Sequence, residues 1–207
     1  MLKVWGRANS SNVRKVLWCA QELGLAYERI DAGGAFGVVD EPAYRDMNPN
    51  GRVPVIDDDG FVLWESNAIV RYLVSRYGVD SSWLPADLQQ RASADRWMDW
   101  MTSSLATPFR DVFWGVLRTP PEQQDRAAIN AALQTCGQLL AIPDAALAEQ
   151  PYLSGAAPGM GDIPLGSFAY AWFEMPVERP HLPHLQAWYE RLKARPAYRA
   201  AVMTALT

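Results

Sequence analysis

The chain has 207 residues, 49% of them hydrophobic, and a formal net charge of −4. This length and apolar content suffice for one large or two small globular domains with cores of their own. The acidic balance argues against a surface that binds nucleic acid or an anionic membrane.

The cysteines and histidines predict no disulfide and no metal site. Cys19 and Cys136 stand alone, without a CxxC motif or the spacing of metal ligands. His181 and His184 have no acidic or cysteine neighbours that could complete a metal site. The chain lacks the charged and apolar regions of a signal peptide and any apolar run near the roughly 18 residues of a membrane span. We therefore expect a cytoplasmic protein with reduced thiols.

Strand and helix patterns alternate in the first 47 residues. A strand is predicted at 2–5, then a turn and a helix that ends near Leu23, before Gly24. Ser10, Ser11 and Asn12 lie at the start of this helix, where any one of them can serve as the N-cap. A second strand is expected at 26–31. The glycine-rich loop after it carries no phosphate-binding motif, and only a short helical turn is expected at 41–47.

Residues 48–67 read NPNGRVPVIDDDGFVLWESN, which predicts turn, strand, turn, strand and helix start. The expected strands are 53–56 and 61–64, joined by a hairpin turn at 57–60. Pro54 is unusual just inside a strand because it has no N–H to donate to a neighbouring strand. The following helix ends at Gly78. Free N–H groups and a capping hydroxyl gather at Ser66, which makes this helix start a site for an anion.

The NPxGxVP motif, followed by a hairpin and a Glu-Ser pair at a helix start, resembles cytosolic glutathione S-transferases of the bacterial serine type, theta- or delta-like. The resemblance implies a thioredoxin-like α/β domain at 1–78, with a cis peptide bond before Pro54. It also implies that Val53 offers its backbone to the cysteinyl part of glutathione, while Glu65 and Ser66 hold the γ-glutamyl end. Arg52 would reach the glycine carboxylate, since a guanidinium group suits a carboxylate.

Serine-type members keep a hydroxyl group in the first strand-to-helix turn, pointed at the sulfur of glutathione. Alignment with the family's Ser-Ser-Pro-Cys-Arg selects Ser11 as the catalytic residue, while Ser10 and Asn12 remain alternatives and Asn12 joins the glutathione-binding set. A hydroxyl donor and the positive end of a helix dipole favour the thiolate, which is the nucleophile. Ser11 would therefore act as a hydrogen-bond donor, and as neither nucleophile nor base.

The second half of the chain predicts an all-helical domain at 88–207 after a linker at 79–87. Its first long helix either breaks at Thr107-Pro108 or continues as a kinked arm to Leu117. The next helix starts near Pro120 and runs to about Ala148, with a kink or break before Pro143. Later helices, the last of them starting at Pro196, complete the bundle.

Residues 152–163 resemble the family's folding signature, in which a Ser or Thr caps a buried helix three residues before an aspartate. Gly159 occupies the cap position here, and a glycine costs only a few tenths of a kcal/mol there. Asp162 still favours the helix start, so it is predicted to be a structural residue.

The resemblance implies a glutathione transferase active in detoxification as a homodimer. Glutathione is a co-substrate, no cofactor is needed, and an apolar electrophile is bound by the helical domain. The candidates for the electrophile site are Phe36, Ser104, Phe109, Arg110 and Trp114. A non-catalytic glutathione-binding or protein-interaction module of the same fold is the alternative, as is a glutathione-dependent peroxidase or dehalogenase.

Overall fold

The computed structural model describes residues 1–206, so the last residue of the predicted helical domain, Thr207, lies outside the described residues. The chain divides into two compact units. The first comprises Met1–Leu84 and Pro196–Thr204, and the second Pro85–Arg195 with the chain end from Ala205. The division falls inside the predicted linker at 79–87. Within the described chain, no helix is long and apolar enough to cross a membrane.

A four-stranded mixed sheet forms the centre of the first unit, with strand order β2-β1-β3-β4. The strands are β1 (Leu2–Trp5), β2 (Tyr27–Ile30), β3 (Val55–Asp58) and β4 (Phe61–Trp64). β1 pairs in parallel with β2 and antiparallel with β3, which in turn pairs antiparallel with β4. The predicted thioredoxin-like architecture is confirmed.

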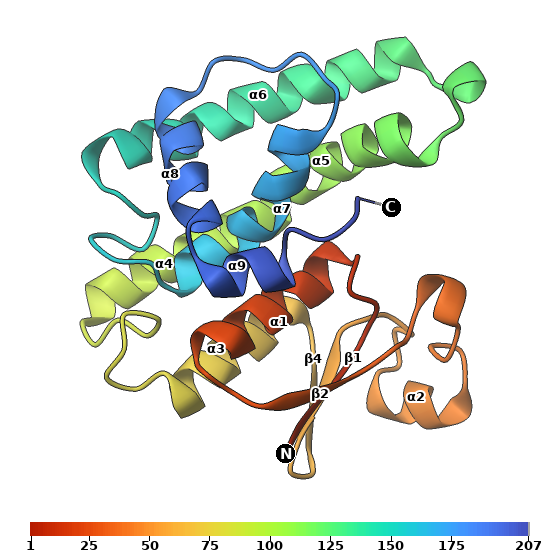
Figure 1. The fold of residues 1–207 in the computed structure, drawn as a ribbon, viewed down its shortest axis with the longest axis vertical. Helices are drawn as coiled ribbons and strands as arrows, with labels where there is room; N and C mark the ends of the chain where they lie inside the picture. The colour runs from red at the N-terminus through yellow and green to blue at the C-terminus, as the bar shows by residue number, and fades with distance from the viewer. Residues whose placement is uncertain (207) are drawn as a thin grey trace. The chain divides into compact units, whose positions relative to one another are not determined.

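Helices cover both faces of this sheet. α1 (Ser11–Glu22) and α3 (Ser66–Tyr77) pack against each other on one face, and α2 (Pro42–Met47) lies on the other (Figure 1). Each strand contributes side chains to the packed core on both faces of the sheet, because successive side chains point to opposite faces. Val4 is fully buried, whereas Trp5 joins the cluster around Tyr44 of α2.

The local signals in this unit are largely confirmed. Asp59 and Gly60 both have positive φ, 51° and 95°, and form the two-residue turn between β3 and β4. Gly24, with φ of 67°, follows the end of α1. The strand expected at 53–56 instead begins at Val55. Pro54 stays outside the strand because it has no N–H to donate.

The last helix, α9 (Pro196–Ala201), belongs to the first unit, although we expected it to complete the helical bundle. It packs on α1, where the Tyr198 ring meets Trp18 edge to face at 4.9 Å. Arg14 of α1 also donates to Thr204 Oγ1 at 2.7 Å. Burial of these aromatic rings draws the end of the chain onto α1, a contact that helical periodicity in sequence does not reveal.

The second unit is helical. Its helices are α4 (Leu88–Trp100), α5 (Ala106–Phe113), α6 (Arg126–Glu149), α7 (Ile163–Glu174) and α8 (Pro183–Lys193). π-helical segments at Met101–Leu105 and Trp114–Arg118 join α4 and α5 into one helical run to Arg118. The chain therefore continues through Pro108, as in the second of the two predicted alternatives. The π-helical segment just before Pro108 is a common way for a helix to absorb a local irregularity.

Pro143 lies inside α6, which runs without interruption from Arg126 to Glu149. The predicted break before this proline is therefore wrong. Leu140, Pro143 and Leu147 are all buried on one face of the helix. Tertiary packing against α5 and α8 thus compensates for the hydrogen bond that the proline removes.

Asp162 is fully buried and accepts four N–H donors near the start of α7. They are the backbone groups of Leu153 (2.8 Å), Ser154 (3.2 Å) and Gly159 (3.1 Å), and the indole Nε1 of Trp188 (2.8 Å). Burial raises the pKa of Asp162, and these donors act in the opposite direction. The carboxylate thereby ties a loop, a helix start and α8 together, in agreement with its predicted structural role.

Replacing Asp162 by Ala leaves four donors without an acceptor, three of them buried, so we expect the free energy of unfolding to fall by about 3–5 kcal/mol. Asp125→Ala is the matched control. Asp125 caps α6 at the surface, where among residues 1–206 it accepts the Ala128 N–H alone, at 3.0 Å, so its loss should cost about 1 kcal/mol. Urea denaturation followed by circular dichroism measures both, and equal losses would contradict the central role of Asp162.

Candidate functional site

A cavity of about 420 Å³ opens in the first unit. It is lined by Asn12, Asn48, Asn50, Arg52, Val53, Pro54, Glu65 and Ser66. All five residues that the sequence predicted for glutathione binding, which are Asn12, Arg52, Val53, Glu65 and Ser66, therefore share one cavity. Ser11 precedes Asn12 in the chain but is not among the lining residues.

The turn before Pro54 is fixed by hydrogen bonds to one carbonyl group. The Arg52 carbonyl accepts from the Tyr44 hydroxyl and from Asn48 Nδ2, each at 2.8 Å. Asn48 is itself buried, and its Oδ1 accepts the Asn50 N–H at 3.0 Å. The Val53–Pro54 bond that follows is cis, as the resemblance implied. Sequence reasoning identified Asn48 and Asn50 only as turn residues and missed that both line the cavity.

Arg52 leaves its guanidinium group available to a ligand. The side chain is exposed, and the described part of the chain supplies it with no hydrogen-bond or ion-pair partner. A cation at the edge of a cavity suits a carboxylate. Its predicted role toward the glycine end of glutathione stays a prediction.

The start of α3 has an unusual backbone. Glu65 is the N-cap residue, with φ of 73° and ψ of 109°, and its side chain makes no capping hydrogen bond. A left-handed φ in a residue other than glycine costs about 1–3 kcal/mol and is typical of functional sites. The expectation that Ser66 caps this helix is wrong, because Ser66 is the first helical residue and its Oγ donates to Asn12 Oδ1 at 3.3 Å.

The three alternatives at the start of α1 differ in their environments. Ser10 is the N-cap by backbone conformation but makes no side-chain capping bond. Ser11 is the first helical residue and is half-buried, and its hydroxyl has no partner within residues 1–206. Asn12 is exposed toward the cavity and accepts from Ser66. The Ser11 hydroxyl is therefore available to donate to a ligand. Asn12 is the one of the three residues that lines the cavity.

Lys15 was not predicted as a site residue, yet it lies directly behind the start of α3. Only 3% of the residue is exposed. Its Nζ donates to Ser66 Oγ at 3.4 Å and to Asn67 Oδ1 at 3.2 Å. Burial lowers the pKa of Lys15 to about 8, and the Glu65 carboxylate acts in the opposite direction. The sequence signal that could have identified Lys15 is its place between Val13 and Val16 in the predicted first helix. Both valines are buried in the structure.

The five candidates for an electrophile site do not share one environment. Phe109 is only 2% exposed and packs against Phe168 and Trp172 in the core of the second unit. Arg110 pairs with Asp111 at the surface, and Ser104 lies in the π-helical segment before α5. Phe36 and Trp114 are 53% and 56% exposed. Packing thus explains Phe109 as a core residue, whereas the rings of Phe36 and Trp114 stay exposed, each in its own unit.

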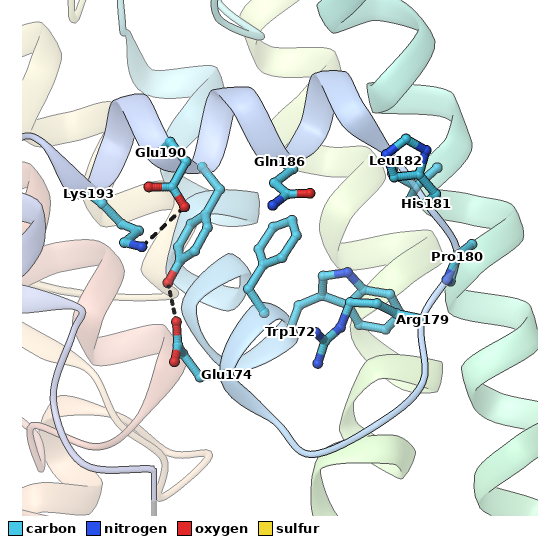
Figure 2. Close-up of a pocket in the computed structure, with 11 residues that line it drawn as sticks. Trp172, Glu174, Arg179, Pro180, His181, Leu182, Gln186, Glu190 and Lys193 are labelled. Atoms are coloured by element: carbon cyan, nitrogen blue, oxygen red, sulfur yellow. Dashed lines mark hydrogen bonds and ion pairs between the residues drawn. The ribbon is translucent and has the colours of Figure 1, made fainter.

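A second cavity, of about 350 Å³, lies in the second unit beside α7 and α8 (Figure 2). Its charged groups are largely engaged with neighbours. The Tyr189 hydroxyl donates to Glu174 at 3.2 Å. Lys193 pairs with Glu190 at 3.1 Å (Figure 2). None of the residues that the sequence predicted for a site lines this cavity.

The thiols of this protein are unsuited to catalysis. Cys19 and Cys136 are buried, and burial raises the pKa of each thiol. A buried thiol with a raised pKa is unreactive, so a reactive sulfur has to come from a ligand. The described residues contain no group of three or more His, Cys, Asp or Glu side chains that could hold a metal ion.

A thioredoxin-like unit with a polar cavity at its cis-proline turn, followed by a helical unit, defines the glutathione transferase fold. Family models agree: residues 1–75 match the glutathione S-transferase N-terminal domain, and residues 105–196 match the C-terminal domain. The chain belongs to the glutathione S-transferase family.

Several relatives match the chain over nearly its whole length. Glutathione S-transferase GstB of Escherichia coli (strain K12) is 45% identical over 98% of both chains. A probable glutathione S-transferase GSTF1 of Oryza sativa subsp. japonica is 28% identical over 98% of this chain and 96% of its own. Among solved structures, the theta class enzyme of Xanthomonas axonopodis pv. citri with glutathione bound has a TM-score of 0.96. It is 64% identical and covers 100% of this chain and 99% of its own.

The buried charge of Lys15 predicts a pH dependence of stability. Below pH 8 both the folded and the unfolded state hold this proton. Between pH 8 and 10.5 only the unfolded state still holds it, so the unfolded state binds more protons and stability rises with pH. The full rise should be about 3 kcal/mol.

Lys15→Met should abolish this rise. Urea denaturation from pH 7 to 10.5 gives the difference in unfolding free energy between the wild type and this variant. Arg14→Met is the control, because Arg14 is equally buried on α1 but does not titrate in this range. A difference between wild type and Lys15→Met that stays constant with pH would contradict the assignment.

Proposed function

We propose that this protein binds glutathione in the cavity of its first unit, stabilises the glutathione thiolate, and conjugates it to a small apolar electrophile. The observation that carries the proposal is that Asn12, Arg52, Val53, Glu65 and Ser66 line one cavity. The transferase names of the relatives and the glutathione in the Xanthomonas structure favour this reading over a non-catalytic module of the same fold.

Glutathione carries two carboxylates and one ammonium group, and the cavity offers a partner for each. The Arg52 guanidinium takes the glycine carboxylate. Ser66, at the first turn of α3, takes the γ-glutamyl carboxylate, where free backbone N–H groups favour an anion. The Glu65 carboxylate takes the γ-glutamyl ammonium group, and the Val53 backbone pairs with the cysteinyl amide.

This arrangement leaves the cysteinyl sulfur near the start of α1. The Ser11 hydroxyl donates a hydrogen bond to the thiolate, and the positive end of the α1 dipole acts in the same sense. Both effects lower the pKa of the bound thiol, and the cavity holds the nucleophile in position for attack. Ser11 is preferred because its hydroxyl has no other partner within residues 1–206.

The electrophile is an apolar molecule in this proposal, and the exposed ring of Trp114 in the helical unit is a candidate to contact it. Peroxidase or dehalogenase chemistry would use the same thiolate. Assembly as a homodimer is proposed on the family resemblance, and multi-angle light scattering should give about twice the 23.1 kDa chain mass. A mass of one chain would contradict it.

Ser11→Ala should raise the pKa of bound glutathione back toward that of the free thiol, because the thiolate loses its donor. The absorbance of the thiolate against pH measures this directly. Loss of one such donor typically lowers kcat by about 10²-fold or more. Binding of S-methylglutathione, which has no thiol, should change little.

Ser10→Ala and Asn12→Ala are the matched variants in the same turn. If Asn12→Ala raises the thiol pKa and Ser11→Ala does not, the donor is Asn12. Glutathione that binds to the wild type without any lowering of its thiol pKa would contradict the catalytic proposal and leave a binding protein.

A further inference from the structure

Lys15 is connected to the cavity through Ser66. An ammonium group has no lone pair, so Ser66 Oγ must accept from Lys15 Nζ. The hydroxyl hydrogen of Ser66 is then directed at Asn12 Oδ1, 3.3 Å away. Lys15, Ser66 and Asn12 thus form a chain of hydrogen bonds with one direction, from the buried charge to the cavity wall.

The direction of this chain matters for an anion in the cavity. A hydroxyl that accepts from a cation becomes a stronger donor, since hydrogen bonds in a chain polarise one another. A carboxylate at the start of α3 can replace Asn12 Oδ1 as the acceptor of the Ser66 hydroxyl hydrogen. It gains a charge-assisted donor and lies close to the positive charge of a buried ammonium group.

We propose that Lys15 is a positioning residue for glutathione: it holds Ser66 as a donor toward the γ-glutamyl carboxylate and supplies the buried positive charge behind it. Lys15 does not touch glutathione and acts through Ser66. The second acceptor, Asn67 Oδ1, fixes the ammonium group against the first turn of α3. This inference rests on the proposed glutathione site.

Protonation of Lys15 should therefore control affinity. Among the described groups, the Glu65 carboxylate is the charge that shifts the pKa of Lys15. The helices that pack on α1 are α3 and α9, and their other charged side chains are Arg71, Arg76 and Arg199. With a pKa of about 8, Lys15 is charged at pH 6.5 and neutral at pH 9.5. The neutral form of Lys15 gives the folded state higher stability, and it gives the cavity a lower affinity for an anion.

The test is titration calorimetry with S-methylglutathione, which removes the ionisation of the thiol from the measurement. At pH 6.5, Lys15→Met should weaken binding about tenfold, the effect of about 1.4 kcal/mol. Arg14→Met should change affinity less than threefold, because the Arg14 guanidinium group donates to Ala8 O and to Thr204. In a Ser66→Ala background, Lys15→Met should have a clearly smaller effect, because the two residues act as one chain.

The pH profile separates positioning from a merely structural role. Wild-type affinity relative to Lys15→Arg should fall as pH rises through about 8, because arginine keeps its charge and lysine does not. The comparison of wild type with Lys15→Arg still tests the inference if Lys15→Met does not fold. Parallel profiles for wild type and Lys15→Arg, or equal losses in Lys15→Met and Arg14→Met, would overturn the inference.

The two proposals fail in different ways. If the wild type does not bind S-methylglutathione, the proposed function fails and this inference fails with it. If the wild type and a folded Lys15→Met variant bind it equally well, the glutathione site stands and only the role of Lys15 is wrong.

Discussion

The contact between the Lys15 ammonium group and the first turn of α3 connects two helices whose starts line the cavity, and the proposed site depends on it. Burial of an isolated charge costs several kcal/mol, so the ammonium group needs the Ser66 and Asn67 oxygens as partners. Those acceptors lie about fifty residues further along the chain. These two hydrogen bonds link the start of α3 to α1, and Ser66 also meets Asn12 there. The cavity forms where these two helix starts meet the turn that ends at Pro54.

Two unfavourable features coincide at this cavity. Glu65 has a left-handed backbone conformation, and Lys15 is desolvated. Neither is needed for a stable fold, and natural proteins accept such features mainly where function requires them. Other parts of the chain offset the cost. The packing of Tyr198 on Trp18 in the first unit, and the four donors to Asp162 in the second, are satisfied interactions with no role in the cavity.

Local chemistry decided what the sequence could predict. The hairpin at Asp59 and Gly60 and the end of α1 at Gly24 follow from turn and cap preferences over a few residues. Five lining residues were predictable because the motif around Pro54 and the Glu65-Ser66 pair are contiguous in sequence. Lys15, α9 and Phe109 were not, because only contacts between distant segments decide whether a lysine is buried, which unit a last helix joins, or whether a ring is core.

In the proposed mechanism, helix α1 combines binding and activation in one element. Ser11 and Lys15 are four residues apart, so both lie on the same face of the helix. The free N–H groups at its first turn and the Lys15 charge one turn further on both favour an anion at this end. A proton lost from Lys15 removes part of that positive field and also relieves its desolvation penalty. Loss of this proton therefore raises the stability of the fold and weakens anion binding. With a pKa of about 8, Lys15 loses it just above neutral pH.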